Sequence, residues 1–297
     1  MNGPAPAEFR DPGLVDFGGP AGGGRRLELL GGVLVDRPLP QATGPRRLPD
    51  RWATAGAVYG ADRPGGPAAW RFAGAMPEPW RVAVDVGPAT LALEVRPAPS
   101  GQVGVFLEQV EQWRWLAAAA VRGTTVLSLF GHSGAASLAL AAAGAEVVHV
   151  DASRQAIALA RRNAEASGLA HAPIRWVCED AVTFVARAAR RGSRFAGAVL
   201  DPPSWGHGPR GQAFAIDRDL GPLLFAVARL LEPAAGPLLL TSHSPGWRHD
   251  RLEATLGEYL RTAGVDAAGC ESGPLACADA SGRLLPLGDF ARWLPSR

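Results

Sequence analysis

The sequence predicts an α/β fold: a mostly parallel, doubly wound sheet with helices on both faces, preceded by a smaller α+β domain. The first observation is a strand–turn–helix–strand pattern. It runs from an apolar stretch at residues 126–130 through a glycine turn at 131–134 and a helical stretch at 135–143 to a second apolar run that ends at Asp151. The second observation is that further helical and apolar stretches follow in alternation. Such alternation is typical of a parallel sheet whose strands are joined by helices.

Asp151 follows the second strand of this pattern, at the position where an acid can accept hydrogen bonds from a ribose diol beside the glycine turn. A dinucleotide fold uses Gly-x-Gly-x-x-Gly, because pyrophosphate must lie against bare backbone. This turn carries only Gly131 and Gly134, with Ser137 where a third glycine would be. It suits the uncharged thioether end of a nucleoside better than a pyrophosphate. The pattern therefore favours S-adenosylmethionine over NAD as cofactor.

Two more acids follow predicted strands. The strand at 174–177 leads to Glu179 and Asp180, an acid placed to reach the adenine amino group. The strand at 195–200 ends in Asp201, Pro202 and Pro203, a stiff corner because each proline fixes φ. In methyltransferases of this layout, that corner faces the methyl group and the nucleophile.

From about residue 101 to the C-terminus, the chain resembles the bacterial class I S-adenosylmethionine-dependent methyltransferases related to the large-subunit (23S) rRNA methyltransferases. The resemblance implies a class I Rossmann-like sheet, S-adenosylmethionine as cofactor, and methyl transfer to RNA, with an rRNA base as the leading substrate. The matching segments are residues 104–109, 127–137, 149–153, 160–169, Asp180, 200–204, 282–286 and 290–293.

The resemblance and the motifs together give a set of candidate site residues. Asp201 and Pro202 are the catalytic candidates. Substrate contacts are expected from Pro203, Trp205, Arg210 and His243; a tryptophan and an arginine in the loop after the corner could stack a flipped base. No metal ligands are expected. The cofactor-binding candidates are Phe106, Gln109, Phe130, Gly131, His132, Ser133, Gly134, Ser137, Asp151, Ala152, Ser153, Asp180, Ala181 and Asp201.

The modified atom is a separate question. Relatives that methylate carbon-5 of cytosine carry a cysteine just after the fifth strand, because a thiolate must add to carbon-6 first. This chain has His243 there, within residues 240–244. Cys178 is more typical of a small buried side chain than of a nucleophile. Carbon-5 chemistry is therefore doubtful, and methylation of an exocyclic or ring nitrogen fits the Asp201 corner better.

Three domains are expected along the 297 residues. Residues 1–24, rich in Gly, Pro and Ala without a basic signal-peptide region, are predicted to be a flexible tail. Residues 25–97, where stretches at 27–36 and 81–95 alternate apolar and polar side chains, are predicted to be a small α+β auxiliary domain. Residues 98–297 are predicted to be the methyltransferase domain.

Composition limits the class of protein further. No apolar stretch is long enough to span a bilayer, and three cysteines without disulfide or zinc spacing indicate a reduced, cytoplasmic compartment. The net charge of +2 does not by itself indicate a nucleic-acid partner. A methyltransferase of a small molecule or protein side chain, and a non-catalytic cofactor- and RNA-binding module, stay open as alternatives. The oligomeric state also stays open.

Overall fold

The computed structural model describes residues 12–61, 63, 66–207, 213–232 and 236–295. The chain divides into two compact units. Unit 1 contains Met1–Val84, Ala92–Glu108 and Ala276–Pro286, and unit 2 contains Asp85–Leu91, Gln109–Leu275 and Leu287–Arg297. By this division residues 276–286 belong to unit 1, although the sequence predicts one domain from residue 98 to the end.

A five-stranded sheet forms unit 1, in the order β1-β2-β3-β4-β5. Only β3 and β4 pair in parallel; the other neighbours are antiparallel. One short helix, α1 (Pro49–Ala53), buries Trp52 against the sheet residues Val15, Leu27 and Leu29. A separate two-stranded sheet pairs β6 (Arg81–Asp85) with β7 (Thr90–Glu94). The five strands are β1 (Gly13–Gly18), β2 (Arg25–Leu30), β3 (Val33–Pro38), β4 (Ala57–Ala61) and β5 (Ala68–Phe72).

The prediction of a flexible tail over residues 1–24 is wrong for its second half. Residues 13–18 form β1, which pairs with β2, and Leu14, Val15 and Phe17 are buried. The glycine and proline residues on either side made this segment look like a loop in the sequence. It is instead a short strand whose apolar side chains form part of the core. Residues 1–11 lie outside the described residues.

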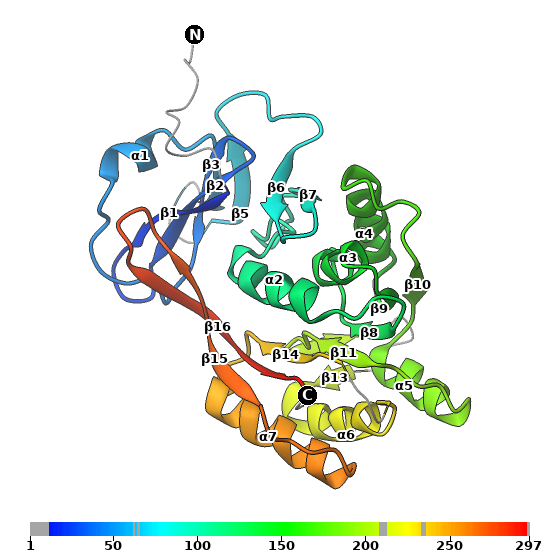
Figure 1. Cartoon of the computed structure of the whole chain (residues 1–297). Coiled ribbons are helices and arrows are strands. Elements are labelled where there is room, and N and C mark those ends of the chain that lie inside the picture. The colour runs from blue at the N-terminus through cyan, green and yellow to red at the C-terminus, as the bar shows by residue number, and fades with distance from the viewer. Residues whose placement is uncertain (1–11, 62, 64–65, 208–212, 233–235, 296–297) are drawn as a thin grey trace. The chain divides into compact units, whose positions relative to one another are not determined.

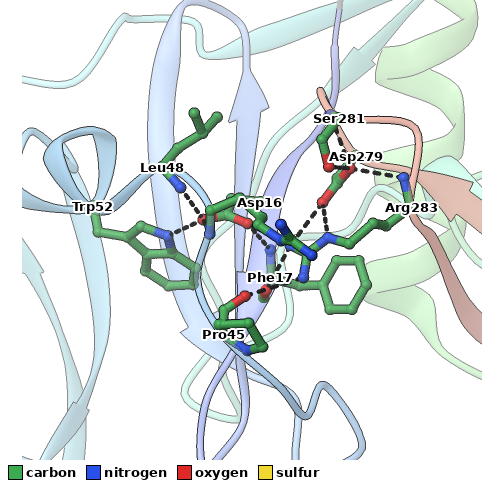
Figure 2. Close-up of polar contacts among 9 residues, drawn as sticks. Asp16, Phe17, Pro45, Leu48, Trp52, Asp279, Ser281 and Arg283 are labelled. Atoms are coloured by element: carbon green, nitrogen blue, oxygen red, sulfur yellow. Dashed lines mark hydrogen bonds and ion pairs between the residues drawn. The ribbon is translucent and has the colours of Figure 1, made fainter.

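Asp16, in the middle of β1, is fully buried and is held by hydrogen bonds from several directions (Figure 2). Its carboxylate accepts from the backbone N–H groups of Arg47 and Leu48 at 2.9 Å and from Trp52 Nε1 at 2.8 Å. Arg283, from the C-terminal segment of unit 1, adds an ion pair at 2.7 Å. A buried carboxylate needs such partners because an unpaired one would be strongly destabilising.

Unit 2 is built on a seven-stranded sheet in the order β10-β9-β8-β11-β14-β16-β15. The first five strands in this order are parallel, and β14 pairs antiparallel with β16. This confirms the predicted mostly parallel sheet. The chain order reverses at β8, which lies between β9 and β11, and such a switch point opens a crevice at the carboxyl ends of the strands. The strands are β8 (Thr125–Leu129), β9 (Glu146–Asp151), β10 (Ile174–Cys178), β11 (Gly197–Leu200), β14 (Leu238–Ser242), β15 (Glu271–Ala278) and β16 (Leu284–Trp293).

Helices cover both faces of this sheet, with α2, α3 and α4 on one side and α5, α6 and α7 on the other (Figure 1). The alternation of strand side chains explains the two layers. Val126 of β8 packs with Leu116 and Leu140 of α2 and α3, whereas its neighbour Leu127 joins the cluster formed with α5, α6 and α7. The helices are α2 (Val110–Ala119), α3 (Ala135–Ala142), α4 (Arg154–Ala166), α5 (Ala181–Arg190), α6 (Ile216–Ala228) and α7 (His249–Thr262).

Candidate active site

Polar residues follow the carboxyl ends of five neighbouring parallel strands of unit 2. Strand pairing places Asp151, at the end of β9, opposite Cys178 of β10, and aligns Leu129 and Leu200, at the ends of β8 and β11, with Leu240 of β14, two residues before that strand ends. The segments that follow these strands therefore begin along one edge of the sheet. They carry the candidates Gly131, Asp151, Asp180, Asp201 and His243.

The turn after β8 has an unusual backbone. Phe130 and His132 have positive φ angles of 56° and 43°, and Gly134, the N-cap residue before α3, has φ of 84°. A Cβ at Gly131 would lie 2.3 Å from His149 Cε1, and one at Gly134 would lie 2.8 Å from the Ala160 Cβ. Both glycines are therefore required by close packing. Positive φ at bulkier residues costs free energy and is concentrated at functional sites.

The carboxylate of Asp151 is fixed by two backbone donors. Its Oδ2 accepts from His132 N–H at 2.9 Å, and its Oδ1 accepts from Ser153 N–H at 2.8 Å. Ser153 begins α4 as its N-cap and accepts from Ala156 N–H at 3.2 Å. A carboxylate offers about four acceptor positions, so the two oxygens retain capacity for two further donors such as ribose hydroxyls. Ala152 lies between Asp151 and Ser153 in the sequence. Its backbone carbonyl accepts a weak hydrogen bond from Cys178 Sγ at 3.6 Å.

Beneath the turn lies a buried polar layer. Ser137 Oγ is 2.9 Å from His149 Nδ1, and both side chains are fully buried. Burial, and after it the nearby His132, lowers the pKa of His149 to about 3, so this imidazole stays neutral. Asn163 of α4 is also fully buried and donates to the Ser133 carbonyl at 2.9 Å. Asn163 thus fixes the turn from below.

After β10, the two acids have different environments. Glu179 forms an ion pair with Arg187, so its charge is compensated. Asp180 caps α5, where its Oδ1 accepts from Thr183 N–H and Oγ1–H, each at 2.8 Å, and Ala181 is the first helical residue. Its other oxygen accepts no hydrogen bond within the described residues, which leaves it for a ligand. The cysteine before them, Cys178, is exposed, so its expected burial is wrong: it is the last residue of β10.

The corner after β11 brings together residues from two strands. Asp201 Oδ1 accepts from Thr241 Oγ1–H at 2.6 Å and lies 3.7 Å from His243 Nδ1. Burial acts to raise the pKa of Asp201, but the adjacent His243 and the Thr241 hydrogen bond outweigh it and hold the pKa below its usual value. The side chain is still 41% exposed and can reach a ligand. Thr241 was missed from the sequence, although its place at the end of β14, beside β11, could have indicated it.

The expected substrate contacts are only partly described. Pro202 is buried and Pro203 is exposed. Trp205 begins β12 (Trp205–His207), which pairs with β13 (Ala213–Ala215), and its side chain is 60% exposed. Arg210 lies outside the described residues.

The two candidates that precede the sheet belong to different units. Phe106 is half-buried in unit 1, whereas Gln109 is buried in unit 2 at the end of the short helix η2 (Leu107–Gln109). Their contact with a cofactor stays a prediction. In the part of the chain that the structure describes, no cluster of three or more His, Cys, Asp or Glu side chains could hold a metal ion. The same residues contain no helix long and apolar enough to cross a membrane.

The chain is similar in sequence to known proteins. The family model described as conserved hypothetical protein 95 matches residues 109–207. Ribosomal RNA large subunit methyltransferase I of Aeromonas hydrophila is 30% identical over 168 residues, which is 56% of this chain and 41% of that protein. Ribosomal RNA large subunit methyltransferase K/L of Methylococcus capsulatus is 32% identical over 149 residues, which is 50% of this chain and 20% of that protein. The chain thus spans less than half the length of these curated relatives.

A solved structure is similar over nearly the whole chain. The S-adenosylmethionine-dependent methyltransferase from Agrobacterium tumefaciens is 37% identical, with a TM-score of 0.83. The match covers 96% of this chain and 91% of that one, so it includes both units.

Proposed function

Because this chain belongs to the S-adenosylmethionine-dependent methyltransferases, we propose that it transfers a methyl group from that cofactor to a nitrogen of an RNA base, with large-subunit rRNA as the leading substrate. The predicted fold, enzyme class and resemblance are confirmed at the level of the family. The RNA substrate rests on the names of relatives that this chain covers only in part, and on the exposed Trp205 beside the Asp201 corner.

The residues present fit the cofactor. Asp151 would accept from the ribose hydroxyls, since its carboxylate is already oriented by His132 and Ser153. The free oxygen of Asp180 would accept from the adenine amino group. The methionine part would lie against the turn at residues 130–134, whose backbone is held in place by the packing of Gly131 on His149 and by Asn163. When bound, S-adenosylmethionine supplies an electrophilic methyl group on a sulfonium.

The observation that carries the proposed chemistry is the environment of Asp201. Thr241 and His243 orient its partly exposed carboxylate and lower its pKa, which makes it a strong hydrogen-bond acceptor and a weak proton acceptor. It would therefore hold the N–H of an amine and direct the nitrogen lone pair toward the methyl group, with the proton leaving to water. The Pro202 carbonyl would accept from a second N–H. In-line displacement depends mainly on such positioning.

Carbon-5 of a pyrimidine is a poorer acceptor for this site. It needs a thiolate near carbon-6, and His243 lies beside Asp201 instead. Cys178 ends β10, three strands from β11, which is roughly 14 Å at the usual strand spacing. Cys270 and Cys277 lie before and within β15, beyond the other side of β14 in the sheet order. Free cysteines are consistent with the reduced cytoplasmic location that we propose.

The test uses the full chain, labelled S-adenosylmethionine, and large-subunit rRNA from cells that lack this protein. Nucleoside mass spectrometry should show one N-methylated base. Asp201→Asn should lower kcat/KM by about 10²–10⁴-fold, because the amide turns a donor toward the amine, while cofactor affinity stays nearly unchanged. Asp250→Asn, an exposed acid on α7, is the matched control. A 5-methylpyrimidine product, or RNA with 5-fluorocytosine trapped on a cysteine, would contradict the nitrogen assignment.

A further inference from the structure

A cavity of about 290 Å³ opens in unit 2, away from the candidate active site. Its rim carries four arginines, Arg175, Arg187, Arg191 and Arg194, and its floor is apolar, with Phe184 and Phe195. We call it the arginine pocket. Nothing in the site described above uses these residues, apart from the pairing of Arg187 with Glu179.

The pocket lies at the amino-terminal edge of the parallel sheet. Thr125, which lines it, is the first residue of β8, and Arg175 is the second residue of β10. Arg187 is in the last turn of α5 and Arg191 is its C-cap, and α5 leads back from the carboxyl ends of the strands. Because β8 is five residues long, the pocket is roughly 17 Å from the edge that carries Asp151 and Asp201.

Positive charge is concentrated in the part of the sequence that supplies most of this pocket. Residues 152–200 carry eight arginines and three acids, although the whole chain has a net charge of only +2. No acidic side chain lines the pocket among the described residues. Arg175 and Arg191 are exposed and have no ion pair within the described part of the chain. Arg194 donates to the Arg229 carbonyl at 3.0 Å, which holds its guanidinium at the rim.

The dipole of helix α5 explains the position of only two of these four arginines. Arginines in the last turn of a helix interact favourably with the helix dipole, which explains Arg187 and Arg191. Arg175 comes from β10 and Arg194 from the loop before β11, so the dipole of α5 does not explain them. Arginines from three separate elements converge on one cavity.

The chemistry of the pocket suits phosphate diesters. A guanidinium binds phosphate oxygens with two parallel hydrogen bonds, and the apolar floor reduces screening by water. The guanidinium of Arg187 lies over the ring of Phe184, with its Cζ 5.1 Å from the ring centre. An extended polyanion fits better than one small anion, because the rim charges surround an open cavity.

We propose that the arginine pocket binds backbone phosphates of the RNA substrate, away from the reacting base. This inference rests on the proposed RNA methylation. The pocket and the active site are roughly 17 Å apart, so one RNA strand of several nucleotides can contact both. The pocket adds affinity for RNA to a chain whose net charge is only +2.

The test compares Arg175→Ala/Arg191→Ala with Arg114→Ala/Arg261→Ala, a double variant that removes the same charge from α2 and α7. Binding to large-subunit rRNA from cells lacking the protein is measured over a salt series. The pocket variant should lose on the order of tenfold in affinity at 150 mM salt. Its slope of log K against log salt should become shallower by about 1.4–1.8, as expected for two lost phosphate contacts. The control should behave like the wild type.

Separate readouts distinguish the pocket from the proposed function. Cofactor affinity should be unchanged in both double variants, and kcat at saturating RNA should stay within about twofold while KM rises in the pocket variant. If the pocket variant binds RNA like the control while the wild type methylates rRNA, the pocket assignment is wrong and the function stands. Tight binding of inorganic phosphate that is lost in the pocket variant, without an effect on RNA, would instead assign the pocket to a small anion. A wild type without RNA methylation would contradict the proposed function itself.

Discussion

At the scale of single residues, the carboxylate of Asp151 is the group on which cofactor affinity should depend most. We predict that Asp151→Ala weakens S-adenosylmethionine binding at least tenfold, about 1.4 kcal/mol, because two charge-assisted hydrogen bonds to the ribose are lost. Isothermal titration calorimetry measures this directly. Glu165→Ala, which removes an exposed acid of α4, is the control and should keep the wild-type affinity. A folded Asp151→Ala protein with wild-type affinity would remove Asp151 from the cofactor site.

A second prediction at this scale concerns His149 and pH. The unfolded chain binds a proton on this imidazole below about pH 6.5, whereas the folded chain does so only near pH 3. Between these values the unfolded state holds one more proton, so the contribution of His149 to the free energy of unfolding falls as pH falls, by about 1.4 kcal/mol per unit. Urea unfolding at pH 5, 6 and 7 should show a shallower pH dependence for His149→Gln. The exposed His171→Gln should keep the wild-type dependence; equal slopes in both variants would show that His149 is protonated in the fold.

At the scale of elements, the turn between β8 and α3 depends on the ring packed beneath it. Gly131→Ala would place a methyl group 2.3 Å from His149 Cε1, and that ring is held by Ser137 and cannot move easily. We predict a loss of about 1–3 kcal/mol of stability, together with weaker cofactor binding. Gly74→Ala, where the added Cβ meets nothing within 4 Å, should change stability by less than about 0.5 kcal/mol.

The double variant Gly131→Ala/His149→Ala gives a sharper test of this contact. Removing the ring should recover part of the loss, so the two changes should be non-additive by about 0.5–3 kcal/mol. Chemical denaturation of the two single variants and the double variant closes the cycle. Strict additivity would mean that the destabilisation has another cause.

The same turn shows how far sequence patterns reach. The strands and helices around Gly131 were predictable because each combines an apolar run with a clear boundary, and Asp151 and Asp201 follow from their place at strand ends. The supporting layer of Ser137, His149 and Asn163 was not predictable, because the burial of these polar residues depends on which helix packs on which strand. Ser137, which the sequence places among the cofactor contacts, has its hydroxyl fully buried against His149. Thr241 contacts Asp201 only because β11 pairs with β14, and these two strands are far apart in the sequence.

At the scale of the whole molecule, unit 1 is assembled from three separated parts of the chain, with residues 276–286 added after most of unit 2. Local composition and patterning along the chain predict only contiguous domains. They could not show that Arg283 forms an ion pair with Asp16, which lies 267 positions earlier in the sequence. A fragment limited to the predicted auxiliary domain, residues 25–97, would lack both β1 and this arginine.

We predict that Arg283→Ala lowers the stability of unit 1 by about 3–5 kcal/mol, because the buried carboxylates of Asp16 and Asp279 lose their shared cation. Hydrogen exchange should become faster at the amides of β1 and β2, whereas those of β8 and β11 keep their protection and cofactor affinity is retained. Arg81→Ala, an exposed arginine of β6, is the matched control and should leave exchange in β1 unchanged. Unaltered exchange in Arg283→Ala would mean that the hydrogen bonds of Asp16 to Arg47, Leu48 and Trp52 suffice to hold the strand.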